Sequence, residues 1–524
     1  MSRRQSILEK RKTPWDIIII GGGITGAGIL REALRCGLRC LLLDQKDFAW
    51  GTSSRSGKLV HGGLRYLKQG QVKTTWHSVR EREKLLLECG GLVEPLGFLM
   101  PTYLGDRLGP LLLQAGLSVY DLIALRKSRR RFRPEDIALM APALKGDKLS
   151  GGFWYRDART DDARLVLNVI REAVNLGGFA LNYVRVTNLC SVRGRVRGVA
   201  VEDMLTGQCG EIEARVVINA TGVWADQVRS MVHSTPGLRR LRGSHLIFPG
   251  WRFPLALAVS IHHPGDGRPL YAFPWEGVTL LGTTDLDHEH SLEAEPWISL
   301  REGKYLMEAV QHYFPSLNLS GNDVVSTFSG VRPVVNTGKT DPSREAREHV
   351  IWADNGLITI TGGKLTTFAL LARAALAIAR KYIGRPGVIP PKPGEKKAST
   401  NLPSISSEIA GNCEYRRLAG RYGTGALDLL KDCRAEDLTA VPGTETLWGE
   451  IPWAAREEVV HLDDLLLRRV RLGMLVPEGG VSILSRLRKL AQPVLGWDNT
   501  RWEMEETRYF DLWKQFYSPG LIYN

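Results

Sequence analysis

Three glycines near the N-terminus have the spacing of a loop that can hold a nucleotide phosphate. They form the pattern Gly21-x-Gly23-x-x-Gly26, and an acid, Asp44, lies eighteen residues beyond the last glycine. In such a loop the first glycine allows a tight turn, the second lets the backbone approach a pyrophosphate, and the third lets the helix pack closely on the sheet. The helix N-terminus attracts the pyrophosphate, and the acid accepts a hydrogen bond from a ribose hydroxyl. The pattern therefore predicts a dinucleotide site.

The glycine pattern does not separate FAD from NAD, and a glycine-rich turn without a ligand is the structural alternative. Two later segments favour FAD. Residues 216–225, VVINATGVWA, predict a strand that ends in small residues, and in many flavoproteins such a strand lies against the cofactor. Residues 362–367, GGKLTT, open a further helix whose N-terminal amides would stabilise the negative charge of a reduced flavin. Each segment alone also suits ordinary strand–helix packing, but all three in this order indicate a flavoprotein.

The elements that would position these loops are visible in the hydrophobic pattern. Apolar runs at 16–20 and 40–44 enclose a helical stretch, which predicts a βαβ unit. A strand-rich region spans about 151–323, and near 358–360 an apolar strand returns before an Ala- and Leu-rich helix over 366–382. The segment 384–403 carries five prolines and predicts a linker. Beyond it the chain has mostly helical periodicity, as in 465–474.

The composition restricts the class of protein without identifying a partner. A chain of 524 residues is too long for one hydrophobic core, so two or three domains are expected. The net charge of +14 suits nucleic acid, anionic lipid or phosphorylated metabolites equally. A basic nucleic-acid-binding protein would fit the charge, but no nucleic-acid motif is present and the glycine segments would be unexplained. The seven cysteines and the histidine pairs lack metal-ligand spacing, so we expect free thiols in a reducing, cytoplasmic setting and assign no metal.

Eight blocks of sequence resemble one known family, the FAD-dependent, quinone-reducing glycerol-3-phosphate dehydrogenases of respiration. The blocks run in the family's order over about residues 15–385, and HGGLRYL and GGKLTT are the most specific to it. They are GGGITGAGI (21–29), TSSRSGKLVHGGLRYL (52–67), DARTDDARLVL (157–167), NATGVWAD (219–226), RGSHLIF (242–248), LGTTD (281–285), SGVRP (329–333) and TGGKLTTF (361–368). More weakly, LLLRRVRLGM (465–474) resembles the family's helical cap.

The resemblance implies an α/β fold with three parts. A Rossmann-like FAD-binding domain of the glutathione-reductase and D-amino-acid-oxidase type would interleave with a mixed-sheet substrate domain over 14–385. The substrate side would comprise about 70–150 and 235–330, followed by a linker at 386–404 and a C-terminal helical cap at 405–524. Residues before the first strand exceed the family's pattern by about ten, and Asp44 stands where glutamate is commoner, a change that keeps the ribose contact.

The same resemblance, with the motifs, implies the residues that contact FAD. They follow the three glycine segments and the loop after Asp44. They are Gly21, Gly23, Ile24, Thr25, Gly26, Asp44, Gln45, Thr52, Ser53, Ser54, His61, Gly62, Gly63, Leu64, Val186, Ala220, Thr221, Gly222, Gly363, Lys364, Leu365 and Thr366.

The implied reaction is the oxidation of glycerol 3-phosphate to dihydroxyacetone phosphate by hydride transfer to flavin N5. A phosphate dianion needs charged donors, and by the resemblance these are Arg65, Arg332, Arg347 and Lys364, with Tyr66 in the same pocket. Arg347 lies in the charged stretch REARE, where a solvated surface charge is the alternative.

Removal of the hydroxyl proton needs a base, and a histidine suits this role because its pKa lies near neutrality. His245 is our choice, with Arg332 and Lys364 as the other catalytic candidates. His61 is the competitor, although it also suits a place beside the flavin.

The electron acceptor is expected to be a membrane quinone, because the long insertion associated with oxygen-using glycerophosphate oxidases is absent. That oxidase, or an amine or hydroxy-acid oxidase of the same fold, is the alternative. The apolar stretch 108–125 precedes a basic run at 126–133 and would suit peripheral binding to the inner face of the cell membrane; a buried helix followed by a solvated loop is the equal alternative. Pro110 and Gly116 are expected to break the stretch, so no spanning helix is predicted. The oligomeric state is open, with a homodimer among the options.

Overall fold

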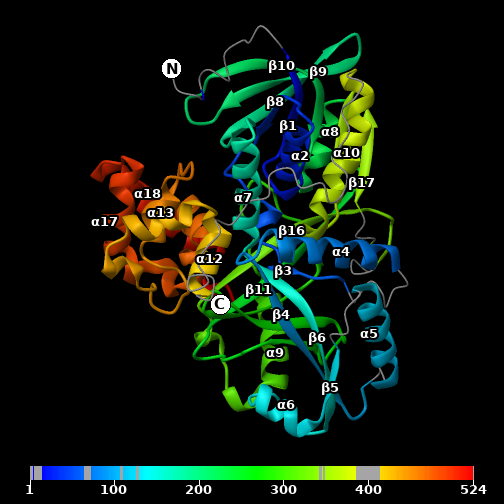
Figure 1. The fold of residues 1–524 in the computed structure, drawn as a ribbon, viewed down its shortest axis with the longest axis vertical. Coiled ribbons are helices and arrows are strands. Elements are labelled where there is room, and N and C mark those ends of the chain that lie inside the picture. The colour runs from blue at the N-terminus through cyan, green and yellow to red at the C-terminus, as the bar shows by residue number, and fades with distance from the viewer. Residues whose placement is uncertain are drawn as a thin grey trace.

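Two mixed β-sheets organise the chain in the computed structural model (Figure 1). The residues described are 4, 14–63, 72–106, 110–124, 129–340, 345, 349–384 and 413–522. The expected linker, 386–404, and the start of the expected C-terminal domain lie outside them. Within the described residues one sheet has eight strands and the other has ten.

The first sheet has the predicted βαβ unit at its centre. Its middle strand, β1 (Trp15–Ile20), is buried along its whole length, as expected for a strand with parallel neighbours on both sides. The order across the sheet is β17 (Val350–Asp354), β18 (Leu357–Thr361), β10 (Cys209–Asn219), β1, β2 (Cys40–Leu43) and β7 (Phe179–Leu181), with β9 (Arg195–Asp203) on β10 and β8 (Val184–Val192) on β9. Strands β18, β10, β1, β2 and β7 are parallel, so their carboxyl ends share one edge.

Three helices cover one face of this sheet. Helix α2 (Ile24–Arg35) lies between α7 (Asp162–Asn175) and α10 (Phe368–Ile383) and contacts both. One hydrophobic cluster joins the helices to the sheet through Ile17 and Ile19 of β1. The helix predicted over 366–382 is therefore α10, entered through a short 3₁₀ turn, Leu365–Thr367.

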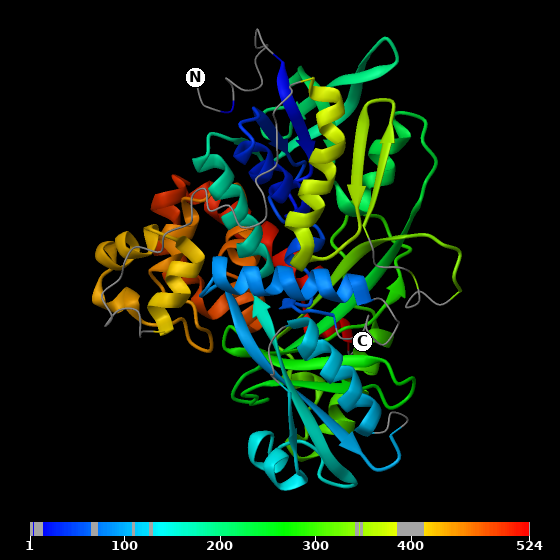
Figure 2. The same cartoon turned by 45° about the vertical axis from the view of Figure 1, so that its right-hand side comes forward.

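The second sheet lies below the first in Figure 1. Its order is β15 (Leu286–Asp287), β11 (Leu238–Pro249), β14 (Val278–Gly282), β13 (Pro269–Trp275), β12 (Ala258–His262), β4 (Val93–Tyr103), β6 (Leu149–Thr160) and β3 (Leu59–Val60), with β16 (Ser326–Val335) on β11 and β5 (Arg130–Phe132) on β6. The helices beside it are α4 (Val72–Glu88), α5 (Pro110–Ala124), α6 (Pro134–Met140) and α9 (Leu300–Tyr313), whereas α8 (Ala225–Ser230) contacts β18 of the first sheet. Figure 2 shows α4 crossing the boundary between the two sheets.

The last part of the chain is helical and lies beside the junction of the two sheets in both views (Figures 1 and 2). Its elements include α12 (Cys413–Tyr422), α13 (Gly425–Asp432), α14 (Glu450–Ala455), α15 (Leu462–Asp464), α16 (Leu472–Leu475), α17 (Leu484–Leu495) and α18 (Asn499–Phe516). One hydrophobic cluster contains Phe273 and Trp275 of the second sheet together with Leu465, Trp502 and Tyr509 of these helices. The C-terminal helices are thus packed on the second sheet by a shared core.

One local expectation is wrong. Pro110 and Gly116 do not break the apolar stretch, because α5 runs from Pro110 to Ala124. A proline in the first helical turn costs nothing, since its missing N–H has no partner there in any case. The helical periodicity expected over 465–474 is present as two elements: a π-helical turn, Leu465–Arg469, ends before α16, and Arg471 between them has a left-handed φ of 64°. In the part of the chain that is described, no helix is long and apolar enough to cross a membrane.

Candidate active site

A cleft crosses the carboxyl ends of four neighbouring parallel strands of the first sheet. The chain leaves these strands at Gly21 after β1, Asp44 after β2, Ala220 after β10 and Gly362 after β18. The cleft encloses about 1400 Å³ including the part that is open to solvent, and residues from all four exits line it. Ligands of open α/β sheets bind at this edge because the strand exits leave a crevice there.

The glycine loop has the shape that a pyrophosphate requires. Gly21 has a φ of +108°, a conformation that side chains rarely adopt. A Cβ at Gly26 would lie 1.9 Å from the carbonyl oxygen of Gly21, so only glycine lets α2 begin this close to β1. The amide of Ile24, at the start of α2, donates to Ser53 Oγ at 3.0 Å. The positive end of the helix therefore faces the cleft at the position where a phosphate would lie.

Asp44 forms the acidic end of the cleft. Its Oδ2 accepts the amide of Gly22 at 2.6 Å, and its Oδ1 accepts the amide of Lys46 at 2.9 Å. Burial raises the pKa of Asp44 to about 7, against the opposing effect of these two hydrogen bonds. The carboxyl group is therefore poised between its neutral and ionised forms near neutral pH.

Two cations from later parts of the chain also line the cleft. Arg332, from β16, and Lys364, which caps the 3₁₀ turn before α10, both line it. Lys364 Nζ donates to Ser78 Oγ at 2.9 Å, and Arg332 Nη1 lies 3.6 Å from Asp285 Oδ1. Since β18 is three strands from β2, the two ends are separated by roughly 14 Å at a strand spacing of about 4.8 Å. An extended dinucleotide with its ribose at Asp44 and its ring system near Gly363 fits this length.

Most of the predicted residues come together on the wall of this cleft. The wall includes Gly21, Gly23, Ile24, Thr25, Asp44, Gln45, Thr52, Ser53, Val186, Ala220, Thr221, Gly222, Arg332, Gly363, Lys364 and Leu365. The other predicted residues that the structure describes do not line the cleft: Gly26, Ser54, His61, Gly62, Gly63, Thr366 and His245. The predicted residues Leu64, Arg65, Tyr66 and Arg347 lie outside the described residues, so their roles remain predictions.

His245 lies in the middle of β11, buried to 2% exposure. Its ring stacks on Phe328 at a centroid distance of 4.5 Å, and the absence of a side chain at Gly282 makes room for its other face. Burial, with the nearby cations Lys58 and Arg332, holds the pKa of His245 well below its usual range. The imidazole is therefore neutral, and its Nδ1 has no hydrogen-bond partner.

The wall also contains residues that the sequence reasoning did not single out. Trp50 and Trp224 line it with their rings 5.8 Å apart, and Lys46 and Gln227 add polar groups. Lys46 could have been found by its place directly after Asp44 and Gln45. The tryptophans carry no local signal, because an aromatic residue in a loop is as often part of a core as part of a binding site.

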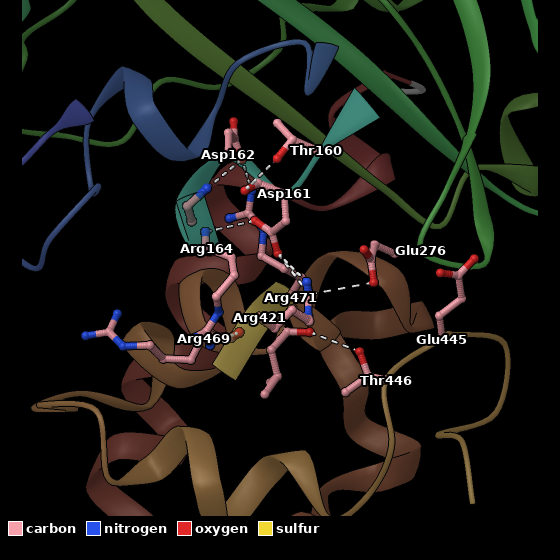
Figure 3. A network of polar contacts seen from close by, with 12 residues as sticks. Thr160, Asp161, Asp162, Arg164, Glu276, Arg421, Glu445, Thr446, Arg469 and Arg471 are labelled. Atoms are coloured by element: carbon pink, nitrogen blue, oxygen red, sulfur yellow. Dashed lines mark hydrogen bonds and ion pairs between the residues drawn. The ribbon is translucent and has the colours of Figure 1, made fainter. Parts of the chain in front are cut away.

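Under the floor of the cleft lies a buried polar network (Figure 3). Ser56, on the wall, donates to Asp162 through its backbone amide and its hydroxyl at 2.9 and 2.7 Å. Lys58 Nζ donates to the same carboxylate at 2.9 Å, and Arg471 of the C-terminal helices reaches it at 2.5 Å. Burial and the neighbouring Arg471 lower the pKa of Lys58 to about 7. The cleft floor therefore depends on side chains from the end of the chain.

Sequence comparison matches two families to this chain. Residues 16–375 match the family described as FAD dependent oxidoreductase, and residues 393–502 match the C-terminal domain of alpha-glycerophosphate oxidase. Aerobic glycerol-3-phosphate dehydrogenase of Bacillus subtilis is 38% identical over 418 residues, covering 79% of this chain and 74% of the relative. The protein of the same name from Staphylococcus haemolyticus is 34% identical and covers 87% and 86%.

Solved structures of related flavoproteins also match this chain. Glycerol-3-phosphate dehydrogenase from Bacillus halodurans, complexed with FAD, has a TM-score of 0.74 at 27% identity and covers 98% of this chain and 96% of its own. L-alpha-Glycerophosphate oxidase from Mycoplasma pneumoniae with FAD bound has a TM-score of 0.56 at 18% identity, covering 70% and 95%, which shows a shared fold alone. These matches confirm the expected fold class and FAD as the cofactor.

Asp44 predicts a pH dependence of cofactor binding. A ribose hydroxyl donates to the carboxylate, so FAD should favour the ionised form, whereas the FAD-free protein takes up a proton at Asp44 below about pH 7. Affinity for FAD, measured by fluorescence titration, should therefore weaken as the pH falls below 7, by up to about tenfold per pH unit.

The matched variant Asp44→Asn cannot ionise, so its affinity should be weaker at pH 8 and should lack this dependence. The raised pKa also means that protonation of Asp44 stabilises the FAD-free fold at low pH, and this contribution is lost as the pH rises through 7. An identical pH slope in Asp44→Asn would exclude Asp44 as its source.

Proposed function

This chain belongs to the FAD-dependent oxidoreductases, in the glycerol-3-phosphate dehydrogenase family, and on that premise we propose that it oxidises sn-glycerol 3-phosphate to dihydroxyacetone phosphate. The observation that carries the proposal is that two cations outside the glycine loop, Arg332 and Lys364, both line the cofactor cleft. An amine or amino-acid substrate gives no reason for two cations there, whereas a phosphate dianion does.

FAD, when bound, supplies the two-electron oxidant, and the chain has to bind the substrate and remove its hydroxyl proton. Arg332 is one-quarter exposed, so its guanidinium can reach a ligand in the cleft while its stem stays packed. Its planar fork suits two phosphate oxygens, and Lys364 adds a point charge. Arg65, Tyr66 and Arg347 complete the proposed substrate site on the strength of the family resemblance.

For the proton we propose His245 as the acceptor, with His61 as the alternative. A base must be unprotonated before the reaction, and His245 is neutral because burial and nearby cations lower its pKa. Its position behind Arg332 places it close to the substrate end of the cleft rather than to the Asp44 end. The unpaired Nδ1 leaves one ring nitrogen available.

We propose a membrane quinone as the electron acceptor, reached through a peripheral contact at α5. This helix buries Leu117 and Tyr120, and it exposes Val119 and Leu122, the latter to 73%. Arg130 and Arg131 of β5 are exposed nearby in the chain, so an apolar face and cations are presented together. Arg129 instead turns back to α5, where its amide donates to Asp121 at 3.2 Å.

Oxygen as the acceptor is the second candidate function. The C-terminal domain matches a family named after alpha-glycerophosphate oxidase, and the Mycoplasma pneumoniae oxidase shares the fold. The two candidates share FAD and the phosphate site and differ only in what reoxidises the cofactor.

Replacing Arg332 tests the phosphate site. Arg332→Ala removes a charged hydrogen bond worth about 1.5–3 kcal/mol, so KM for glycerol 3-phosphate should rise roughly tenfold to a hundredfold while FAD stays bound. Arg332→Lys should restore only part of this, because lysine lacks the planar fork. The control is Arg252→Ala, which removes an ion pair with Asp323 at 2.6 Å away from the cleft wall. An unchanged KM in Arg332→Ala would remove this residue from the site.

Replacing His245 tests the proton acceptor. His245→Asn should lower kcat by about 10²–10⁴-fold without loss of FAD, since asparagine cannot take up the proton. In the wild type, kcat should not fall between pH 7.5 and 6.5 on account of this residue, because its pKa lies well below that range. Near-normal turnover in His245→Asn would instead favour His61 as the proton acceptor.

The acceptor and the membrane contact are tested together with vesicles. Turnover with a hydrophobic quinone should rise when anionic vesicles are added. Arg130→Gln with Arg131→Gln should remove about 2 kcal/mol of lipid attraction, or roughly a thirtyfold loss of vesicle affinity, at about 1 kcal/mol per cation. High salt should also weaken vesicle binding, because the Debye length falls from about 10 Å at 0.1 M to about 3 Å at 1 M.

Reduction of a soluble dye reports the substrate half-reaction alone and should be unchanged in that double variant. Arg193→Gln with Arg434→Gln, at exposed positions on other parts of the fold, is the charge-matched control. If binding to vesicles, measured by co-sedimentation, changes neither at high salt nor in Arg130→Gln with Arg131→Gln, the basic run is a solvated loop. Rapid turnover with oxygen and none with quinone would establish the oxidase instead.

A further inference from the structure

Asp47 is a buried carboxylate beside the cofactor cleft that two arginines hold in place. It follows Asp44, Gln45 and Lys46, which line the cleft, but its own side chain points away from solvent and is 0% exposed. Arg468 Nε donates to its Oδ2 at 2.6 Å. Arg469 donates to both oxygens, at 2.6 Å to Oδ2 and 2.8 Å to Oδ1. Both arginines come from the C-terminal helices and are themselves fully buried.

The π-helical turn Leu465–Arg469 brings these two arginines to one carboxylate. Successive residues of an α-helix point about 100° apart, so neighbouring side chains rarely share a partner. Here Arg468 also pairs with Asp463 at 2.7 Å, while Arg469 is bonded to the carbonyl of Glu457 at 3.0 Å. These further contacts fix the positions of the two guanidinium groups, which can therefore hold Asp47 in one position.

The C-terminal helices also contact the residue that precedes β8, a strand that lines the cleft beside loop 44–47. Tyr183 OH donates to Asp464 Oδ1 at 2.7 Å. Tyr183 directly precedes β8, whose Val184 and Val186 line the cleft. Asn182 joins the two contacts, because its amide donates to Asp47 Oδ1 and to the carbonyl of Glu458, both at 3.1 Å.

Backbone hydrogen bonds connect loop 44–47 to the start of β8. The amide of Val184 donates to the carbonyl of Asp44 at 2.7 Å, and the amide of Tyr183 donates to the carbonyl of Lys46 at 3.0 Å. Loop 44–47 and strand β8 are thus one unit, anchored on one side by Asp47 and on the other by Tyr183. We call this group, Asp47, Tyr183, Asp464, Arg468 and Arg469, the Asp47 clamp.

We propose that the Asp47 clamp makes the C-terminal helical domain a cofactor-retention element, whose arginines position the loop and strand that hold the adenosine half of FAD. The inference rests on the cofactor orientation proposed above, in which the ribose lies at Asp44. Arg468 and Arg469 do not line the cleft, so they are positioning residues that act through loop 44–47. The flavin end, at Gly363 and Lys364, contains none of these contacts.

The test is Arg469→Lys in the full-length protein. Lysine keeps the charge but loses the fork that engages both oxygens of Asp47, so FAD should be released about tenfold or more faster from the holoenzyme. Binding of two fragments to the deflavinated full chain then identifies the affected half: affinity for ADP should fall by a similar factor, and affinity for FMN should stay within about twofold. Turnover of the variant should depend on added FAD at concentrations where the wild type is already saturated.

The matched control is Arg421→Lys. Arg421 is a buried arginine of the same C-terminal domain, and it pairs with Asp161 at 3.0 Å (Figure 3) and not with Asp47. Its replacement should lower the melting temperature without changing the ratio of ADP to FMN affinity. Tyr183→Phe is a milder clamp variant that loses only the hydroxyl contact with Asp464; it should shift FAD and ADP affinity in the same direction as Arg469→Lys, by less, and it serves if Arg469→Lys does not fold.

Unchanged affinity for FAD and ADP in the clamp variants would overturn the inference, as would equal losses for ADP and FMN, which would indicate general destabilisation. These outcomes are separate from the proposed reaction. If the enzyme oxidises a different substrate, the affinities for ADP and FMN still test the Asp47 clamp. If the clamp variants bind ADP and FMN as the wild type does, the proposed oxidation of glycerol 3-phosphate by the FAD-saturated enzyme is unaffected.

Discussion

A carboxylate that is removed from water needs a cation beside it, and much of this structure follows from that constraint. Asp47, Asp161 and Asp162 are buried beneath the cofactor cleft. Lys58 pairs with Asp162, and the other cations come from the C-terminal helices: Arg421, Arg468, Arg469 and Arg471. Breaking one partner of such a pair typically costs about 3–5 kcal/mol, because the other charge is left buried and alone. The helical domain therefore supports the residues beneath the cleft, although its described side chains do not line it.

The part of the site that could be predicted from sequence consists of residues that are close together in the chain and form a motif by their types and spacing. Gly21, Gly26 and Asp44 lie within one βαβ unit, and each has a mechanical role that its residue type and spacing reveal. The pairing of Asp47 with Arg469 joins residues 422 positions apart, and no local pattern records such a contact. The helical periodicity over 465–474 is present, but the sequence does not reveal the π-helical turn or the left-handed Arg471, because Arg469 and Arg471 bond to partners elsewhere in the fold.

His245 shows a similar limit. Its segment, RGSHLIF, has the composition of a strand, and a histidine in that setting suits either a catalytic base or a structural position. Burial against Phe328 and Gly282 depends on which strands pair with β11, which only the fold determines. The charge of +14 was likewise a poor guide to partners, because several arginines that contribute to it are in the interior, where they compensate aspartates and meet no external ligand.

Because 421 positions separate Asp47 from Arg468, Asp47 is synthesised well before the arginine that pairs with it. At about 5–20 residues per second, the ribosome adds that stretch in roughly 20–80 s, and for all of it the nascent βαβ unit holds an aspartate whose cation has not yet been made. Its central strands can pair early, since β1 and β2 are close in the chain. The Asp44 end of the cleft, however, can reach its final form only after Arg468 and Arg469 have been synthesised. The enzyme is thus expected to acquire its cofactor after its C-terminal helices have been made.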